Sequence, residues 1–169
     1  MKHILVPIGS TENASNTLQY AIDFATKFDA KIFVFRAYNF QTKAGTIINI
    51  DSIIERETNL YMRSVVNSVN RKNVEIKLIS AKGSVLDTID SIDNELGIDL
   101  IIVGPKSNSI KDEVFLGRTT GSIVKRTETP VLIIPNGYTY QPIKSILTAF
   151  KSGICLLYTS DAADEEDSV

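Results

Sequence analysis

Two glycines and a cluster of hydroxyl side chains lie between two apolar runs in the second half of the chain. Gly104 follows the run 99–103, and Gly117 precedes the cluster Thr119-Thr120-Gly121-Ser122 and the run 131–134. Glycine lets a chain turn at the end of a buried strand. A helix that begins near Gly117 would direct free backbone N–H groups at an anion. The spacing therefore predicts an anion pocket, of the kind that holds phosphate.

Charged side chains in the same stretch extend this chemistry. The planar guanidinium of Arg118 can pair with a phosphate, and Lys106 lies in the same loop. Asp112 and Glu113 either bind a divalent ion brought by a nucleotide or are solvated loop charges. The alternative for the two glycines is a turn and a helix start that the fold needs with or without a ligand. For the hydroxyl cluster we favour Thr119 as a helix N-cap over a phosphate site or phosphoacceptors.

The sequence does not indicate a dedicated catalyst. Its only histidine, His3, lies at the start of an apolar run, away from the expected pocket. No serine–histidine–aspartate set is available, and no cluster of metal-ligand types occurs. A P-loop and a nicotinamide-binding fingerprint are also absent. We expect a binding or regulatory protein rather than an enzyme, with weak ATP hydrolysis left open.

Apolar runs of strand length alternate with segments of helical period along the first 134 residues. We expect strands at 3–8, 30–38, 74–80, 99–103 and 131–134. We expect helices from the N-cap Ser10 or Thr11 to Phe28, at 51–72 and 84–96, and a short one between Gly117 and Pro130. Alternation of this kind predicts an α/β fold, a doubly wound five-stranded parallel sheet with helices on both faces.

Composition places the chain among globular proteins with one main domain. It has 169 residues, of which 43% are hydrophobic and 22% charged. No apolar run has membrane-spanning length and no signal peptide is visible. The single cysteine, Cys155, allows no internal disulfide. We therefore expect a cytoplasmic protein.

Charge is distributed unevenly along the chain. Five of the 20 acidic residues lie after residue 153, so residues 1–153 carry 15 acidic against 18 basic side chains. The basic residues are scattered rather than gathered in a stripe, which argues against a nucleic-acid surface. We expect neither nucleic acid nor a membrane as partner.

The stretch described first resembles the universal stress protein family. That family has a loop Gly-x2-Gly-x9-Gly-Ser/Thr, and the spacing recurs here as Gly104-x2-Ser107-x9-Gly117-Arg118. The similarity continues to the last apolar run, and residues 2–8 resemble the family's first strand. The resemblance implies strand order 3-2-1-4-5, an adenine nucleotide alpha-hydrolase-like fold, and a ligand crevice where strands 1 and 4 meet.

The same resemblance implies which residues bind a nucleotide, ATP with Mg being the cofactor to expect. These residues are Pro7, Ile8, Gly9, Ala37, Gly104, Pro105, Ser107, Gly117, Arg118, Thr119 and Thr120. Ala37 corresponds to a position near the adenine. Gly9 stands where nucleotide-binding relatives have an Asp, and Ser10 or Thr11 replaces it only weakly, as an acceptor for a ribose hydroxyl. Ser107 replaces the second loop glycine and Arg118 the Ser/Thr.

The resemblance also implies a domain organisation and a function. We expect the family domain at 1–136, a linker at 137–142, the first strand of a truncated second domain at 143–153, and a non-native-looking, disordered acidic tail at 154–169. The tail resembles translated sequencing-adapter sequence. The function implied is a stress-response regulatory module that binds ATP or another adenine nucleotide. The alternatives are a nucleotide-independent dimerisation or interaction scaffold and a weak ATP hydrolase. As partner arrangement we expect a homodimer or a tandem-domain pair formed through strand 131–134.

Overall fold

The computed structural model describes residues 1–9, 13–39, 50–105 and 117–147. Strands and helices alternate along them from the first strand to the last. The strands are β1 (His3–Pro7), β2 (Lys31–Tyr38), β3 (Ile76–Lys82), β4 (Leu100–Val103) and β5 (Val131–Ile133). The helices are α1 (Ala14–Ala25), α2 (Ile50–Asn67), α3 (Val85–Leu96) and α4 (Gly117–Arg126).

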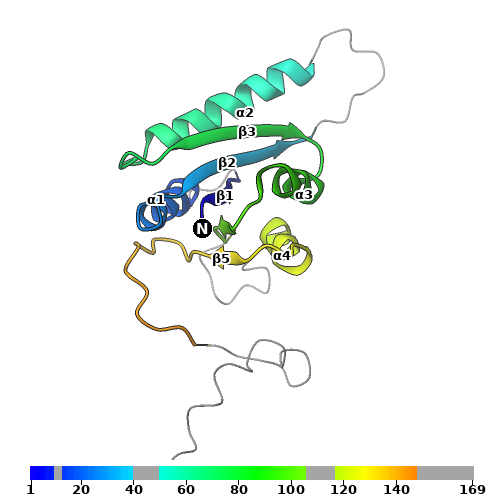
Figure 1. Ribbon diagram of the computed structural model, residues 1–169. Helices are drawn as coiled ribbons and strands as arrows, with labels where there is room; N and C mark the ends of the chain where they lie inside the picture. The colour runs from blue at the N-terminus through cyan, green and yellow to red at the C-terminus, as the bar shows by residue number, and fades with distance from the viewer. Residues whose placement is uncertain (10–12, 40–49, 106–116, 148–169) are drawn as a thin grey trace, which may run out of the picture.

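The strands form one parallel sheet in the order β3-β2-β1-β4-β5, which confirms the predicted fold class and order (Figure 1). β1 lies in the middle, paired with β2 on one side and β4 on the other. β1 runs beside β2 from His3 opposite Lys31 to Pro7 opposite Phe35. The carboxyl ends of these strands therefore lie at one edge of the sheet, where doubly wound folds bind ligands.

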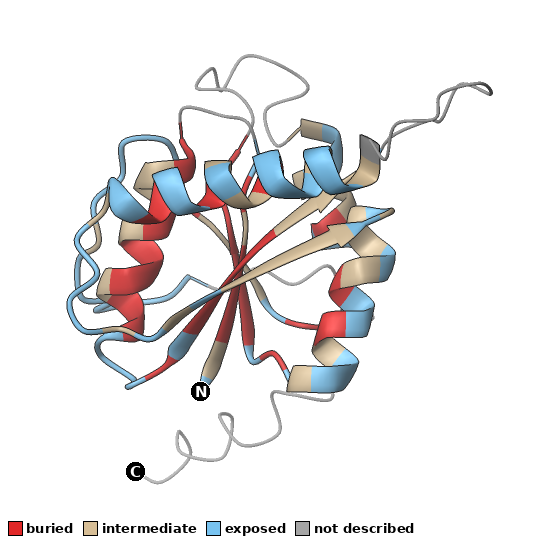
Figure 2. Cartoon of the chain, turned by 90° about the horizontal axis from the view of Figure 1, so that it is seen from above, coloured by how far each residue is buried: buried red, intermediate tan, exposed pale blue. Residues whose placement is uncertain are grey.

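Each face of the sheet buries its own cluster of side chains because neighbouring residues on a strand point to opposite faces. Ile4 and Val6 of β1 belong to the cluster beneath α1 and α2. Leu5 of β1 belongs to the other cluster, with Ile89 of α3 and Ile123 of α4. Buried residues fill the middle of the molecule and the outer helix faces are exposed (Figure 2). The near-continuous apolar strands of the sequence follow from this double burial.

The limits of the first helix differ from the prediction. Its N-cap is Asn13, not Ser10 or Thr11, which lie outside the described residues. The helix ends at Ala25, so Phe28 falls in the turn beyond it and is 48% exposed rather than on the inner face. Phe24 is buried instead. Periodicity alone misplaced Phe28 because the helical repeat continues in the sequence after the helix has ended.

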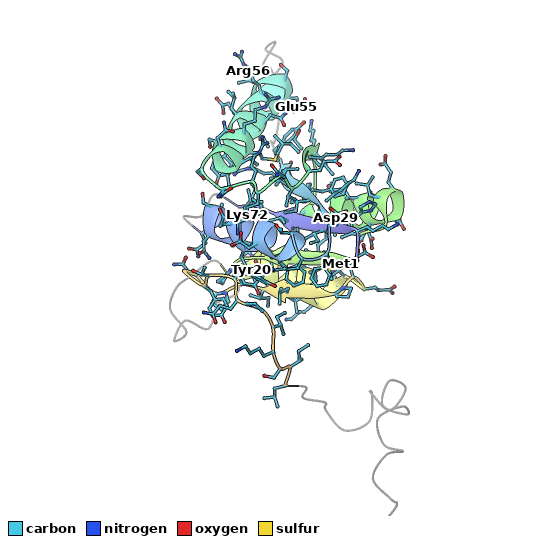
Figure 3. All side chains as sticks on the ribbon, turned by 60° about the vertical axis from the view of Figure 1, so that its left-hand side comes forward. Met1, Tyr20, Asp29, Glu55, Arg56 and Lys72 are labelled. Carbon is cyan, nitrogen blue, oxygen red and sulfur yellow. The ribbon has the colours of Figure 1, made fainter. Side chains whose placement is uncertain are left out.

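Helix α2 and strand β3 also differ in extent from the prediction. α2 ends at Asn67, five residues before the predicted end at 72. Lys72 and Asn73 adopt positive φ angles in the turn that follows, and β3 begins at Ile76. β3 is an edge strand, as the strand order implied by the resemblance requires. The outer face of α2 is exposed, and Glu55 and Arg56 project from it in Figure 3.

The segment after β5 crosses helix α1 without helix or strand of its own. The ring of Tyr140 lies 5.4 Å from that of Tyr20 and 6.1 Å from that of Phe24, between ring centroids. The predicted linker 137–142 is therefore held against the domain. Residues 143–147 form no strand, and Leu147 is 97% exposed. The second domain and the acidic tail remain predictions, since residues 148–169 lie outside the described part.

Candidate functional site

A cleft of about 470 Å³ lies at the carboxyl edge of the sheet, where β1, β2 and β4 end and α4 begins. Ten of the eleven predicted site residues line it, and the eleventh, Ser107, lies outside the described residues. The lining residues are Pro7, Ile8, Gly9, Phe35, Arg36, Ala37, Val85, Val103, Gly104, Pro105, Gly117, Arg118, Thr119, Thr120 and Ile123. The cleft has the size of a small-molecule site.

Gly104 directly follows β4 and packs against helix α1. A Cβ added there would overlap the hydroxyl oxygen of Thr17, a residue only 2% exposed. Gly104 is not among the residues with positive φ. The predicted turn stays a prediction, because residues 106–116 lie outside the described part. Close packing of α1 is a reason for glycine at this position that the sequence did not indicate. The Asn13 side-chain amide donates a hydrogen bond to the Pro105 carbonyl (3.4 Å) and ties the next residue to the same helix.

Helix α4 begins at the cleft with Gly117, whose φ of +73° lies in the left-handed region that favours glycine. Thr119 is therefore the third residue of the helix, and the prediction that it is the N-cap is wrong. The Thr120 hydroxyl donates to the Gly104 carbonyl at 3.1 Å, which joins α4 to the end of β4. The first backbone N–H groups of α4 have no partner within the helix and carry its partial positive charge.

Two arginines line the cleft in different ways. Arg118 is exposed in the first turn of α4. The guanidinium carbon of Arg36 lies 4.2 Å from the ring centroid of Tyr61 in α2, and its neighbours Phe35 and Ala37 face the cluster beneath α3 and α4. Arg36 thus directs its charge to the opposite face of the sheet. The Tyr61 hydroxyl donates to the Gly9 carbonyl at 2.8 Å.

The backbone of β2 presents a donor and an acceptor at the cleft. The Ile8 N–H bonds the Phe35 carbonyl and the Gly83 N–H bonds the Tyr38 carbonyl. Because backbone groups of successive residues point to alternate sides of a strand, the N–H and C=O of Ala37 point to the β1 side. β1 ends at Pro7, opposite Phe35, so its ladder stops before Ala37.

Sequence reasoning missed five lining residues, namely Phe35, Arg36, Val85, Val103 and Ile123. Four are apolar and form the wall beneath α3 and α4. They are core residues whose outer ends reach the cleft. The sequence could have indicated Phe35 as a lining residue, because it lies two residues before Ala37 in the strand and therefore on the same face of the sheet. Val85 and Ile123 come from two helices that only the tertiary structure brings together.

No described lining residue carries a carboxylate. Asp112 and Glu113, which we interpreted either as ligands of a divalent ion brought by a nucleotide or as solvated loop charges, lie outside the described residues. The described part of the chain holds no group of three potential metal ligands. The polar side chains that face the cleft from described residues belong to the first turn of α4. This composition suits an anion at that end of the cleft.

His3, the only histidine of the sequence, and Asp99, which lies beside it in space, are at the amino-terminal ends of the strands, away from the cleft. The sequence predicted this position for His3. The His3 Nδ1 is 2.7 Å from the Leu96 carbonyl, and its ring packs edge-on against Phe33. Backbone N–H groups of Lys2 and His3 donate to the Asp99 carboxylate and lower its pKa. These contacts join the start of β1 to the start of β4 and take no part in the cleft.

Comparison with known proteins gives the chain a family. The sequence profile described as the Universal stress protein family matches residues 1–135. Universal stress protein G of Shigella flexneri is 24% identical over 91 residues, which are 54% of this chain and 63% of that protein. The chain thus spans less than two thirds of that relative. A universal stress protein of Methanocaldococcus jannaschii is 20% identical over 138 residues, 79% of this chain and 81% of that protein.

Solved structures of similar fold include three structures of that family. A protein from Burkholderia pseudomallei has a TM-score of 0.61 at 19% identity and covers 79% of this chain and 96% of its own. A universal stress protein in complex with cAMP has a TM-score of 0.54 at 19% identity, covering 80% and 98%. One from Archaeoglobus fulgidus in complex with dAMP has a TM-score of 0.55 at 17% identity, covering 79% and 97%. No helix in the described part of the chain is long and apolar enough to cross a membrane.

Proposed function

This chain belongs to the universal stress protein family, and on that premise we propose that it is a stress-response module that binds an adenine nucleotide in the cleft. The observation that carries the proposal is the convergence of ten predicted residues on one cleft at the carboxyl edge of the sheet. Family structures in complex with cAMP and dAMP support the choice of ligand class. ATP is the ligand that the resemblance to the family implied.

The phosphates lie at the start of α4 in this proposal. Gly117 leaves the first N–H groups of the helix open to the cleft, and the helix dipole favours an anion there. Arg118 is the described side chain with a positive charge at this position, and its fork can bond two phosphate oxygens. The exposed position of Arg118 leaves it free to turn toward a ligand.

The base lies at the end of β2 in this proposal. The Ala37 N–H and C=O offer one donor and one acceptor on the β1 side of the strand, as the alternation of hydrogen bonds requires. Adenine presents the complementary acceptor and donor at N1 and its amino group. Guanine presents the reverse pair on that edge, so it would face donor with donor. Val85 and Ala37 supply apolar surface for the ring.

Binding rather than turnover is the activity that we propose for this cleft. The described lining residues include no carboxylate and no histidine, so they offer no general base for water attack. Thr120 has its hydroxyl proton committed to the Gly104 carbonyl. We therefore propose that the protein regulates by associating with partner proteins. In this proposal, a bound nucleotide changes the surface around the cleft that such a partner would contact.

A thermal shift assay with ATP, AMP, cAMP and GTP, each with and without magnesium, tests the proposal. At a hundred times Kd, ligand binding stabilises the folded state by about 2.7 kcal/mol, which raises the midpoint by roughly 5 to 10 °C. We expect a shift with adenine nucleotides and a smaller one with GTP. Arg118→Ala should reduce the shift, while the control Arg126→Ala, at the far end of α4, should keep it. No shift with any adenine nucleotide would refute nucleotide binding.

The outer edge of β5 favours a second candidate function, self-association. β5 is the last strand of the sheet and pairs only with β4 among the described strands. Its three residues are apolar and half-buried. An unpaired edge of this kind is a template for another strand, so a homodimer or a tandem pair formed through β5 is the arrangement we propose.

Light scattering over a range of protein concentrations measures this association. Ile133→Lys places a charge on the strand edge and should shift the mass toward the monomer. Val124→Lys is the control, because Val124 is already 42% exposed on α4. A monomer at every concentration, or equal behaviour of the two variants, would count against association through β5.

A further inference from the structure

The edge of the sheet opposite β5 is formed by β3, a strand of seven residues that pairs only with β2 among the described strands. The Ile32 N–H donates to the Glu75 carbonyl at 2.9 Å, so Glu75 and every second residue after it direct their backbone groups to β2. The N–H and C=O groups of Ile76, Leu78 and Ser80 therefore point outward from the sheet. They can form hydrogen bonds with a further strand.

A hollow of about 260 Å³ lies between this edge and the last turns of α2. We call it the α2–β3 hollow, and its lining residues are Arg63, Val66, Asn67, Arg71, Ile76 and Leu78. The three apolar residues are buried or half-buried and form the floor, whereas the three polar residues are exposed and form the rim. On the other side of α2, Ser68 bonds Ser15 of α1, so the rim faces away from α1.

The two arginines of the rim give the α2–β3 hollow a positive charge. Neither Arg63 nor Arg71 forms an ion pair with a carboxylate of the described residues. The acidic side chain beside them in β3's approach, Glu75, pairs instead with Lys31 at 2.9 Å and with Lys77 at 3.6 Å. A guanidinium bonds both oxygens of a carboxylate, so acidic side chains are the complement of this rim.

The α2–β3 hollow lies far from the nucleotide cleft. The Lys82 side chain at the end of β3 donates to the Asp51 carboxylate at the start of α2 (2.7 Å), so the helix runs antiparallel to the strand. Arg63 is about 20 Å along α2 from its first residue, where the undescribed segment 40–49 joins the helix. The hollow is thus at the amino end of β3, and binding there does not depend on a nucleotide.

We propose that β3 binds an extended acidic segment of a partner protein, which joins the sheet as an added strand. The outward backbone groups of Ile76, Leu78 and Ser80 supply the main-chain hydrogen bonds. Successive side chains of the added strand alternate between the two faces, so every second one faces α2. Carboxylates at these positions meet Arg63 and Arg71 above the apolar floor. The partner segment therefore alternates acidic with β-branched residues.

Fluorescence anisotropy with two labelled peptides and the full chain tests this proposal. The probe alternates glutamate with valine between terminal threonines, and the control peptide has the same composition with its glutamates placed together. The double variant Arg63→Glu/Arg71→Glu reverses the charge of the rim, and Arg126→Glu at the end of α4 is its control. Ser80→Pro removes one outward N–H, which an edge strand tolerates, and Ser80→Ala keeps that donor.

We expect the probe to bind about tenfold more tightly than the control peptide, because only alternation satisfies the strand edge and the rim together. The double arginine variant should bind it at least about tenfold more weakly than Arg126→Glu does, the range of two exposed ion pairs. High salt should reduce this difference. Ser80→Pro should bind about fivefold more weakly than Ser80→Ala, the range of one hydrogen bond.

Equal binding of the two peptides, or equal binding by the double arginine variant and Arg126→Glu, would overturn the proposal. A Ser80→Pro protein with the circular dichroism of the unchanged chain and the affinity of Ser80→Ala would overturn strand addition. If Ser80→Pro does not fold, the arginine variants decide the question alone. Self-association that Ser80→Pro abolishes and Ile133→Lys does not would place a second copy of the chain at this edge and overturn the acidic partner.

Discussion

Replacement of Gly104 by alanine separates two reasons for a glycine at this position, packing and ligand approach. The added Cβ would overlap the Thr17 hydroxyl, and Thr17 is almost fully buried between α1 and the sheet. Overpacking of this kind costs about 1–3 kcal/mol. For a domain of this size that corresponds to a fall of roughly 2 to 12 °C in the midpoint of thermal unfolding.

The size of the effect should depend on Thr17. In a Thr17→Ala background the hydroxyl is gone, and Gly104→Ala should then cost less than about 0.5 kcal/mol. The coupling energy of the cycle, about 1–2.5 kcal/mol, reports the clash directly. Urea unfolding followed by circular dichroism gives the four free energies of unfolding. Gly121→Ala is the control, and it should raise the free energy of unfolding rather than lower it. A Cβ added at Gly121 meets nothing within 4 Å, and alanine is more favourable than glycine in a helix by about 0.5–1 kcal/mol.

Binding measurements on the same variants complete the test. If Gly104 is needed for packing alone, the double variant should keep the ATP-induced shift of the unchanged chain. An equal cost of Gly104→Ala in both backgrounds would refute the packing argument. Normal stability of the double variant with a lost ATP shift would show instead that the ligand needs the bare backbone.

Three further predictions concern the rest of the domain. Gly117→Ala should lower the free energy of unfolding by about 1 kcal/mol, measured in urea, because its φ of +73° strains an L-residue. Asp99→Ala should destabilise the protein at pH 7 and progressively less on acidification. The depressed pKa means that the carboxylate stabilises the fold above pH 4 and loses this effect as pH falls through the folded-state value, so unfolding curves from pH 7 to 2 should converge. Tyr140→Ala should lower the thermal midpoint by a few degrees through its lost contact with Tyr20, about 0.5–1.5 kcal/mol, whereas Leu147→Ala should change it by less than 1 °C.

Much of the fold could be predicted because the strands are buried on both faces. An apolar run such as 99–103 has few alternatives to a central parallel strand, and the helices between such runs force right-handed crossovers. The limits of the elements were less certain. Phe28 continues the helical repeat of α1 but lies in the following turn, because a repeat does not state where hydrogen bonding stops. Thr119 was predicted as a cap, and the helix begins two residues earlier.

At the candidate site, the local sequence determined which chemical groups are available to bind an anion. The tertiary structure determined which other residues pack around these groups. The glycines, Arg118 and the hydroxyls were predicted from one stretch, because an anion site at a helix start needs only neighbours in the chain. The bond from Tyr61 to Gly9 and the contact of Thr17 with Gly104 join residues 61 − 9 = 52 and 104 − 17 = 87 positions apart, and the apolar wall combines residues of β2, α3, β4 and α4. Such contacts depend on the order and spacing of packed strands and helices, and no local pattern contains that information.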